Sequence, residues 1–231
     1  MKKYALILAG GVGSRAGGSL PKQFQTVAGL PMLWWSIKCF AQTIPDVETV
    51  VVLHPDYVKE WRRLATESVP ASELIPYDIA PGGASRTESV SNGLQCISAL
   101  HKDKQEDAIV LIHDAARPLI TAEVLERCLH AVKNGVGVIP CVKVTDSLRK
   151  KTSSGSVAVD RDDYLAVQTP QTFMLRDILK AYGSINDDRS FTDDASVAEA
   201  AGLKIITSEG DPRNFKVTNP MDFKLAEALL K

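Results

Sequence analysis

The stretch YALILAGGVGSR, residues 4–15, decides the fold of this chain, because a short apolar run leads straight into a cluster of glycines. Residues 4–9 have the continuous apolar character of a buried strand. Gly10, Gly11 and Gly13 follow, and glycine lets backbone N–H groups close around a phosphate without interference from a Cβ atom. The stretch therefore predicts the first strand of an α/β sheet, with an anion-binding loop at its carboxyl end.

Further short β-branched runs alternate with segments of helical period along the rest of the chain. This alternation is typical of a mainly parallel sheet flanked by helices. We therefore expect a Rossmann-like α/β fold in a single domain of residues 1–231. The expected strands are residues 4–9, 47–53, 109–112, 135–140 and 203–207, and the expected helices are residues 32–41, 56–67, 85–100, 121–133 and 220–230.

Residues 141–168, called the arm below, break this alternation. The tripeptide Ser-Ser-Gly at 153–155 is a turn signal between two short alternating stretches, 142–148 and 156–159. Both stretches are too polar and too thin to form a core, and an isolated hairpin is only marginally stable in water. We expect a protruding β-hairpin arm that packs on a second copy of the chain in a homodimer.

Composition argues against several classes of partner. The 27 Lys and Arg residues balance 28 Asp and Glu residues, so the formal net charge of −1 gives no general attraction for nucleic acid. No apolar stretch is long enough to span a membrane. The four cysteines are widely spaced and show no zinc-type pattern, which is typical of reduced thiols in a cytoplasmic protein. We expect a cytoplasmic protein without nucleic-acid or membrane partners.

The glycine loop alone fits more than one class of nucleotide-binding protein. Gly11, Gly13 and Ala16 satisfy the loose dinucleotide pattern, so an NAD-dependent Rossmann reductase is one alternative. Against it, Pro21 and other turn residues stand where an apolar helix should begin, and no acid ends a second strand about 20 residues on. A P-loop is excluded because no glycine-lysine-hydroxyl triplet is present. A nucleotide-binding module without catalytic activity is the other alternative.

Two cations, Arg15 and Lys22, share the long loop after the first strand. A triphosphate bound with magnesium still carries excess negative charge, and that charge rises on the leaving group during phosphoryl transfer. We therefore expect Arg15 and Lys22 to be catalytic. The alternative is that both are ordinary solvated loop charges.

Asp114 comes just after the expected strand 109–112, in the crevice where open α/β sheets bind ligands. Its carboxylate is suited to a ligand hydroxyl or to magnesium, and Arg117 is suited to a phosphate. The alternative is a structural pair of Asp114 with Arg117 that closes the turn. We expect His113 to be hydrogen-bonded to backbone.

The sequence offers no convincing Ser-His-Asp or Cys-His arrangement and no HExxH motif. None is needed for one reaction class, because a phosphomonoester with a second pKa of about 6 is largely dianionic near neutral pH and can attack phosphorus without a protein base. Catalysis then requires alignment of two anions and neutralisation of charge. We expect Lys216, in an apparent strand at 214–218, to join Arg15 and Lys22, with Mg²⁺ held chiefly by the triphosphate.

Several motifs together resemble one enzyme family. LAGGVGSR followed by PKQF, at residues 8–15 and 21–24, is similar to the signature of sugar-phosphate nucleotidyltransferases. The remaining motifs are GGASRTESV (82–90), HDAARP (113–118), VDRDDYLAVQTPQ (159–171), FTDDAS (191–196) and NFKVT (214–218). In this order they resemble methylerythritol phosphate cytidylyltransferases over essentially the whole chain.

The resemblance implies transfer of CMP from CTP to 2-C-methyl-D-erythritol 4-phosphate, with release of pyrophosphate, in non-mevalonate isoprenoid precursor biosynthesis. A ribitol-5-phosphate cytidylyltransferase is the near alternative, because it shares the loop and strand-end motifs. The two-alanine HDAARP motif and the VDR…QTPQ spacing favour methylerythritol phosphate.

The resemblance also implies the residues that bind each substrate. The implied CTP-binding residues are Ala9, Gly10, Gly11, Gly13, Gly82, Gly83 and Ser89. The implied acceptor-binding residues are Asp114, Arg117, Ser147, Arg161, Thr169, Thr192 and Lys216. Ser147 stands where the family usually has threonine. In the expected homodimer, each arm delivers Arg161 to the acceptor site of its partner.

Overall fold

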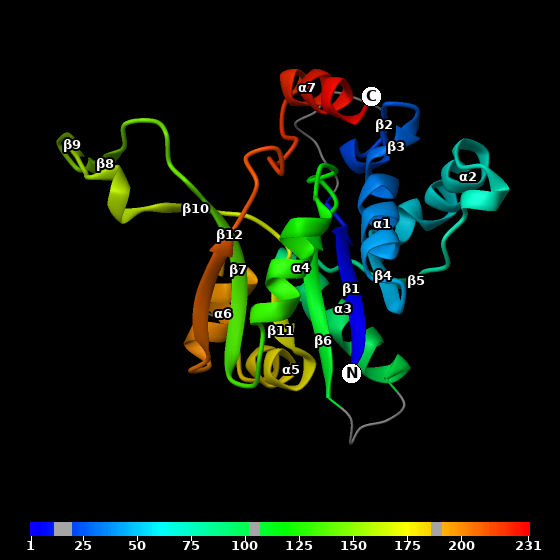
Figure 1. Cartoon of the computed structure of the whole chain (residues 1–231), viewed down its shortest axis with the longest axis horizontal. Coiled ribbons are helices and arrows are strands. Elements are labelled where there is room, and N and C mark those ends of the chain that lie inside the picture. The colour runs from blue at the N-terminus through cyan, green and yellow to red at the C-terminus, as the bar shows by residue number, and fades with distance from the viewer. Residues whose placement is uncertain (12–19, 102–106, 186–190) are drawn as a thin grey trace.

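One eight-stranded sheet organises the fold, in a computed structural model that describes residues 1–11, 20–101, 107–185 and 191–231 (Figure 1). The strands of this sheet are β1 (Lys2–Ala9), β4 (Val47–Leu53), β5 (Asp78–Pro81), β6 (Ala108–Asp114), β7 (Val136–Lys143), β10 (Leu165–Val167), β11 (Gln171–Met174) and β12 (Lys204–Glu209). Their order is β10-β7-β11-β6-β1-β4-β5, and β12 pairs with β7. Strands β5, β4, β1 and β6 run parallel, as do β7 and β12, whereas β10 and β11 are antiparallel to their neighbours. The expected mainly parallel α/β sheet is confirmed.

Helices cover both faces of the sheet. Alternation along β1 explains this arrangement, because Ala5 and Ile7 point to one face, Tyr4 and Leu6 point to the other, and all four are fully buried. The helices whose side chains join the first cluster are α1 (Met32–Thr43), α2 (Val58–Ser68) and α4 (Ala122–Ala131). Those that join the second are α3 (Arg86–Leu100), α5 (Leu175–Gly183) and α6 (Asp194–Ala200).

A smaller cluster lies at one end of the molecule, where α7 (Pro220–Leu230) packs near a short hairpin of β2 (Thr26–Val27) and β3 (Leu30–Pro31) (Figure 1). Asn219 caps α7 and forms a capping box with Asp222, which fixes the start of the helix. The short 3₁₀ turns among the described residues are η1 (Lys22–Phe24), η2 (Pro55–Tyr57), η3 (Ala71–Glu73) and η4 (Arg161–Asp163).

The structure differs from the sequence prediction at residues 214–218, which were expected to form a strand. This prediction is wrong. The segment runs extended along the end of the sheet, and Val217 N–H donates to the Ala116 carbonyl at 2.8 Å, but no strand ladder forms. A buried Val217 between exposed neighbours imitates strand alternation without a pairing edge.

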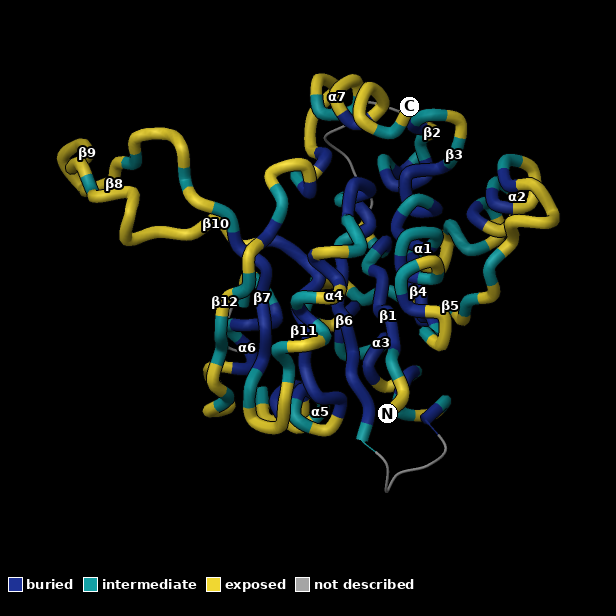
Figure 2. The backbone as a smooth tube through the Cα atoms, in the orientation of Figure 1, coloured by how far each residue is buried: buried dark blue, intermediate teal, exposed yellow. Residues whose placement is uncertain are grey.

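The arm leaves the sheet after β7 and returns to it at β10. Between them, β8 (Arg149–Thr152) and β9 (Gly155–Ala158) form a separate two-stranded hairpin that extends away from the body (Figure 1). The turn lies at 153–155 as expected, but the first hairpin strand is Arg149–Thr152 rather than 142–148. Every residue of β8 and β9 is exposed (Figure 2).

Candidate functional site

A cleft of about 680 Å³ opens at the carboxyl ends of β1 and β6. The chain goes from β1 to β4 on one side, and β6 lies on the other side of β1, so the cleft occupies the point where the strand order reverses. Ligands of open α/β sheets bind at such points. The residues that line the cleft are Leu8, Ala9, Gly10, Gly11, Lys22, Gln23, His54, Gly83, Ala84, Ser85, Arg86, Ser89, Asp114, Ala115, Ala116, Lys216 and Thr218.

Two glycine segments form one wall of this cleft. The Cα atoms of Gly10 and Gly82 approach so closely that a methyl group on Gly82 would lie 3.4 Å from Gly10 Cα and 3.3 Å from the Leu53 carbonyl oxygen. The backbone N–H of Gly83 donates to Ser89 Oγ at 3.0 Å. A side chain at residue 82 would therefore press these two backbone segments slightly apart, and Ser89 on α3 holds the second segment by its bond to Gly83.

Two cations face Asp114, the last residue of β6. Lys216 Nζ lies 2.7 Å from Asp114 Oδ2, and an Arg86 guanidinium nitrogen lies 4.0 Å from Oδ1. Burial raises the pKa of the Asp114 carboxyl, but Lys216, Arg86 and Arg117 outweigh that effect and lower the pKa below its usual value. Asp114 is therefore ionised at neutral pH.

Arg86 is held in place by a buried network. Its guanidinium makes two hydrogen bonds, of 2.8 and 2.7 Å, to the carboxylate of Asp194, which is fully buried. Tyr182 donates its hydroxyl hydrogen to the same carboxylate at 2.6 Å. Burial disfavours the charged guanidinium, but Asp194 and Asp114 reverse this and raise the pKa of Arg86. Arg86 is a permanent cation of the cleft.

A chain of hydrogen bonds through His113 and Thr169 holds the backbone of Asp114 in place. The Arg117 carbonyl can only accept, so His113 Nε2 donates to it at 3.1 Å, and Nδ1 accepts from the Thr169 hydroxyl at 3.0 Å. Thr169 Oγ1 in turn accepts from the Asp114 backbone N–H at 3.1 Å. Burial lowers the pKa of His113 to about 4, so the ring is neutral. The expected hydrogen bond of His113 to backbone is confirmed.

Arg117 does not form the alternative closing pair with Asp114. Its guanidinium donates instead to the carbonyls of Asn214, at 2.8 Å, and Val167, at 3.3 Å. It ties the segment before Lys216 to the end of β10, and it does not line the cleft.

The structure brings together most of the predicted catalytic and CTP-binding residues that it describes. Ala9, Gly10, Gly11, Lys22, Gly83, Ser89, Asp114 and Lys216 line the cleft, and Gly82 adjoins it. Lys22 Nζ donates to the Val217 carbonyl at 2.9 Å, which joins the glycine loop to the segment that carries Lys216. Gly13 and Arg15 lie outside the described residues.

Five of the seven predicted acceptor-binding residues do not line the cleft. Two of them, Arg117 and Thr169, make the contacts described above, and the other three lie in loops or on the arm. Ser147 and Thr192 are exposed in loops, before β8 and before α6. Arg161 is on the arm, where its guanidinium donates to the Thr145 carbonyl. Within this one chain, these residues do not converge on the cleft.

Sequence reasoning assigned no role to Gln23 and Arg86, although both line the cleft. Gln23 directly follows Lys22, and Arg86 lies inside the motif GGASRTESV, so each belonged to a quoted motif. An uncharged amide such as Gln23, or a single arginine at the start of a helix such as Arg86, forms no sequence pattern that would indicate a functional role. Their roles depend on distant partners, Ala9 and Asp194, that only the fold identifies.

The described cleft offers one carboxylate to a metal ion, that of Asp114. No group of three or more His, Cys, Asp or Glu side chains suitable for a metal occurs in residues 1–11, 20–101, 107–185 and 191–231. Magnesium commonly takes one or two carboxylates together with substrate phosphates and waters. The donor set therefore fits an ion that is held mainly by a bound triphosphate.

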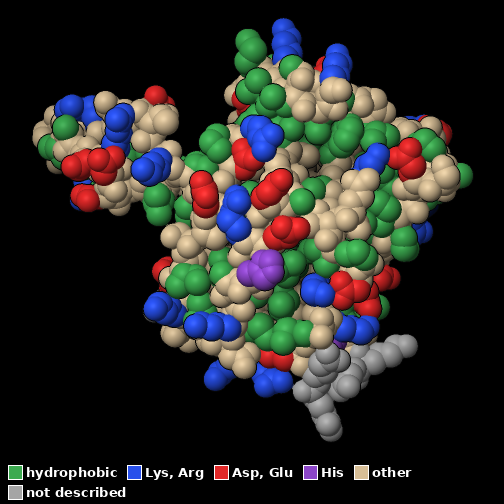
Figure 3. Space-filling view, viewed as in Figure 1, with side chains coloured by type: hydrophobic (Ala, Val, Ile, Leu, Met, Phe, Trp, Pro, Cys, Tyr) green, Lys and Arg blue, Asp and Glu red, His purple; other side chains and the backbone are tan. Residues whose placement is uncertain are grey.

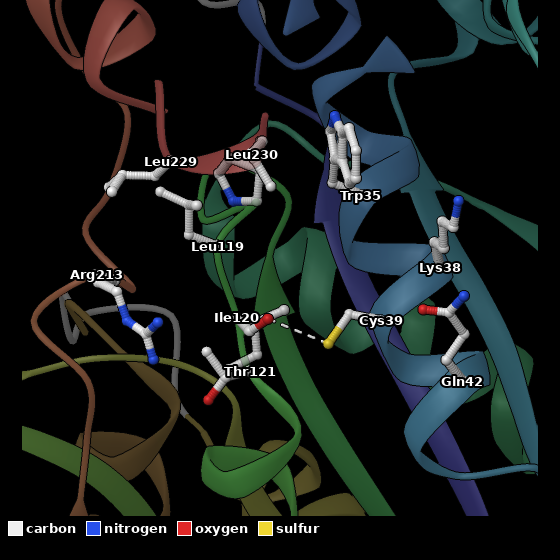
Figure 4. Close-up of a pocket in the computed structure, with 11 residues that line it drawn as sticks. Trp35, Lys38, Cys39, Gln42, Leu119, Ile120, Thr121, Arg213, Leu229 and Leu230 are labelled. Atoms are coloured by element: carbon white, nitrogen blue, oxygen red, sulfur yellow. Dashed lines mark hydrogen bonds between the residues drawn. The ribbon is translucent and has the colours of Figure 1, made fainter. Parts of the chain in front are cut away.

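A second, smaller hollow of about 260 Å³ lies between α1, the loop after Pro118 and the end of α7 (Figure 4). Figure 4 shows Leu119, Leu229 and Leu230 on one side and Trp35 and Cys39 on the other, with the Cys39 thiol donating to the Ile120 carbonyl at 3.1 Å. Of the predicted site residues that the structure describes, none lines this hollow.

Known proteins similar to this chain agree with the motifs. The family model for 2-C-methyl-D-erythritol 4-phosphate cytidylyltransferase matches residues 4–231. The 2-C-methyl-D-erythritol 4-phosphate cytidylyltransferase of Bacteroides thetaiotaomicron is 38% identical over 230 residues, with 100% of both chains covered. That of Ralstonia nicotianae is 39% identical over 236 residues, with 99% of this chain and 92% of the relative covered.

A solved structure agrees as well. The crystal structure of 2-C-methyl-D-erythritol 4-phosphate cytidylyltransferase from Thermus thermophilus matches with a TM-score of 0.74 at 28% identity, covering 99% of this chain and 98% of that one. In the parts of the chain that the structure describes, we find no helix long and apolar enough to cross a membrane.

Proposed function

Because the chain belongs to the 2-C-methyl-D-erythritol 4-phosphate cytidylyltransferase family, we propose that the cleft between the glycine loop, α3 and Asp114 is its active site. The chain is a cytidylyltransferase that transfers CMP from CTP to 2-C-methyl-D-erythritol 4-phosphate and releases pyrophosphate, in the synthesis of isoprenoid precursors. The observation that carries the proposal is the meeting of Lys22, Asp114 and Lys216 in one cleft beside the paired glycine segments.

The glycine wall is the proposed binding surface for cytidine. Ala9, Gly10 and Gly11 present backbone groups to the cleft, and Gly82 and Gly83 face them. The Oγ of Ser89 accepts from Gly83 N–H, which leaves the hydroxyl hydrogen to donate to an acceptor such as the carbonyl of cytosine. Gly13 is proposed to complete this surface.

The proposed chemistry needs no protein base. An oxygen of the dianionic acceptor phosphate attacks the α-phosphorus of CTP, the new P–O bond forms, and the bond to the β-phosphate oxygen breaks to release pyrophosphate. Lys22, with Arg15, is proposed to neutralise charge on the triphosphate and the departing pyrophosphate. Lys216 is proposed to hold the acceptor phosphate in line, which requires it to exchange Asp114 for that phosphate.

A magnesium ion fits this scheme as a further neutralising charge on the triphosphate. Asp114 would hold it, because its carboxylate is ionised and lines the cleft. Release of Lys216 to the acceptor phosphate would free the same carboxylate for the ion.

We also propose that residues 1–231 act as one nucleotidyltransferase domain whose arm builds a homodimer. The arm bears exposed apolar side chains, Val157, Tyr164, Leu165 and Val167, which 39–50% exposure leaves largely uncovered in one chain. A partner subunit would bury these side chains, and Arg161 of the arm would then lie near the acceptor site of that partner. Family resemblance assigns four further residues to the same acceptor: Arg117, Ser147, Thr169 and Thr192. The four free cysteines favour a cytoplasmic location.

Initial rates of pyrophosphate release from magnesium-CTP and 2-C-methyl-D-erythritol 4-phosphate test the placement of the active site. Lys22→Gln removes one preorganised charge, so we expect turnover to fall by roughly 10²–10³. The matched control is Lys224→Gln on the exposed surface of α7, which should leave turnover unchanged. Near-parental turnover of Lys22→Gln at saturating substrates would show that the reaction does not use this cleft as proposed.

A further inference from the structure

Gln23 is a buried amide at the end of the long loop that follows β1, and none of the roles above uses it. Its side chain is 4% exposed and lines the cleft from η1, directly after Lys22. Its Nε2 group donates to the Ala9 carbonyl at 2.7 Å and to the Gly11 carbonyl at 2.8 Å. One side-chain nitrogen therefore joins two carbonyls that are two residues apart.

This contact fixes the backbone where glycine alone would leave it free. Glycine restricts its own dihedral angles least of all residues, so Gly10 and Gly11 lose the most freedom when the loop is ordered. On one side, Gly10 lies against Gly82 and Ser89. On the other side, Gln23 holds the carbonyls before and after Gly10. Residues 9–11 are thus held from both sides before any ligand arrives.

An amide is the side chain that this position requires. Its two N–H hydrogens match two carbonyl acceptors, and it carries no charge that would compete with a nucleotide phosphate. A carboxylate of the same shape would only accept, and would face two carbonyl oxygens. Methionine has nearly the same length and volume but no strong donor.

We propose that Gln23 is a positioning residue that sets the affinity of the glycine loop for CTP. It acts by holding the backbone of Ala9–Gly10–Gly11 in the form that meets the base and ribose, and it does not touch the reacting atoms. The inference rests on the proposed function, because it takes this loop as the nucleotide-binding wall. Preorganisation of this kind improves binding by reducing the ordering that a ligand must cause.

The test compares Gln23→Met with the control Gln25→Met, which changes the glutamine that directly follows η1 and does not line the cleft. Calorimetric titration of each purified variant with magnesium-CTP gives Kd, and initial rates give kcat and the KM for each substrate. One net hydrogen bond changes an equilibrium by roughly 2- to 13-fold, so losing two predicts a rise in Kd of roughly 5- to 160-fold. The KM of the acceptor and kcat at saturating CTP should stay within about threefold of the parent.

Gln23→Glu supplies a second readout that a merely structural role would not move. At about pH 8 the carboxylate repels both carbonyls, so its Kd relative to the parent should be the worst of the set. At about pH 5.5 a protonated carboxyl regains one donor, so the ratio of variant Kd to parent Kd should shrink by at least about threefold. If Gln23→Met binds CTP as the parent does, or if the Gln23→Glu ratio is the same at both pH values, the positioning role is refuted. Failure of the parent itself to bind CTP would refute the proposed function instead.

Discussion

Replacing Asp114 by asparagine separates a role in the reaction from a role in folding. The substitution keeps the shape of the side chain and removes a charge that faces Lys216 at 2.7 Å and Arg86 at 4.0 Å. A hydrogen bond to a charged group is worth about 1.5–3 kcal/mol. If the Asp114 carboxylate makes one such hydrogen bond to the bound substrates, losing that bond slows turnover by roughly 10- to 150-fold.

The effect of the same change on stability should be smaller. Lys216 is 45% exposed, so water can solvate its ammonium once the pair is lost, and ion pairs of this exposure contribute about 1 kcal/mol or less. Arg86 keeps both of its hydrogen bonds to Asp194. Asp114→Asn should therefore unfold in urea within about 1 kcal/mol of the parent while its pyrophosphate release falls at least tenfold.

Asp211→Asn is the matched control. Asp211 has the same side-chain exposure as Asp114, 14%, and pairs with Arg213 at 2.6 Å, but it does not line the cleft. Because Arg213 is even more exposed than Lys216, loss of this pair should change stability as little as Asp114→Asn does, and turnover per folded molecule should stay at the parental level. If Asp114→Asn instead loses stability while its folded fraction keeps full specific activity, Asp114 is a structural residue and its assignment to the reaction fails.

The neutral ring of His113 makes stability depend on pH. The unfolded chain takes up a proton on this ring near pH 6.5, but the folded chain does so only near pH 4. The contribution of the neutral ring to the free energy of unfolding is therefore complete above about pH 6.5 and declines as pH falls toward 4. Between about pH 7.5 and pH 5 the parent should lose about 2 kcal/mol of unfolding free energy in urea that His113→Asn does not lose, and equal losses in both proteins would contradict the buried neutral ring. If each arm delivers Arg161 to the acceptor site of its partner while Lys216 acts in its own subunit, Arg161→Ala and Lys216→Ala should each be nearly inactive. After the two variants are remixed, about half of the dimers should be mixed and roughly a quarter of all sites should recover. Native mass spectrometry that shows mixed dimers without recovered activity would place Arg161 in its own subunit's site or in none.

Five of the eight strands of the sheet could be predicted because local sequence codes for them, whereas β5, β10 and β11 were not expected. β1 and β4 are short apolar runs with turn residues after them, and β4 spans the expected residues 47–53. The segment from β11 through α6 was not predicted, because β11 has only four residues and begins with two polar ones. Gln171, although buried, is bonded to Asp193 and to Ala195 N–H, more than 20 residues on. Burial by such distant contacts leaves no periodic signal.

The candidate site shows the same division. Glycines after a first strand and an acid at a strand end follow general rules of α/β sheets, so Gly10 and Asp114 could be placed in one cleft from sequence alone. The partners of these residues could not. Lys216 reaches Asp114 from 102 residues away along an extended segment that resembles a strand, and Arg86 depends on a buried acid in α6. The hairpin of the arm stays apart from the body in one chain, with charged side chains spread over its surface (Figure 3), so no contact within one chain indicates a role for Arg161.

Phosphorus NMR of the product tests the central claim most directly. The purified chain is incubated with CTP, magnesium and either 2-C-methyl-D-erythritol 4-phosphate or ribitol 5-phosphate, and the spectrum is followed with time. With the first acceptor we expect two coupled diphosphate signals to grow together with free pyrophosphate, in a one-to-one ratio of diphosphate product to pyrophosphate. With the second acceptor we expect the same signals to grow at least about tenfold more slowly. Pyrophosphate without a coupled diphosphate product, faster conversion of ribitol 5-phosphate, or no consumption of CTP with either acceptor would contradict the assignment.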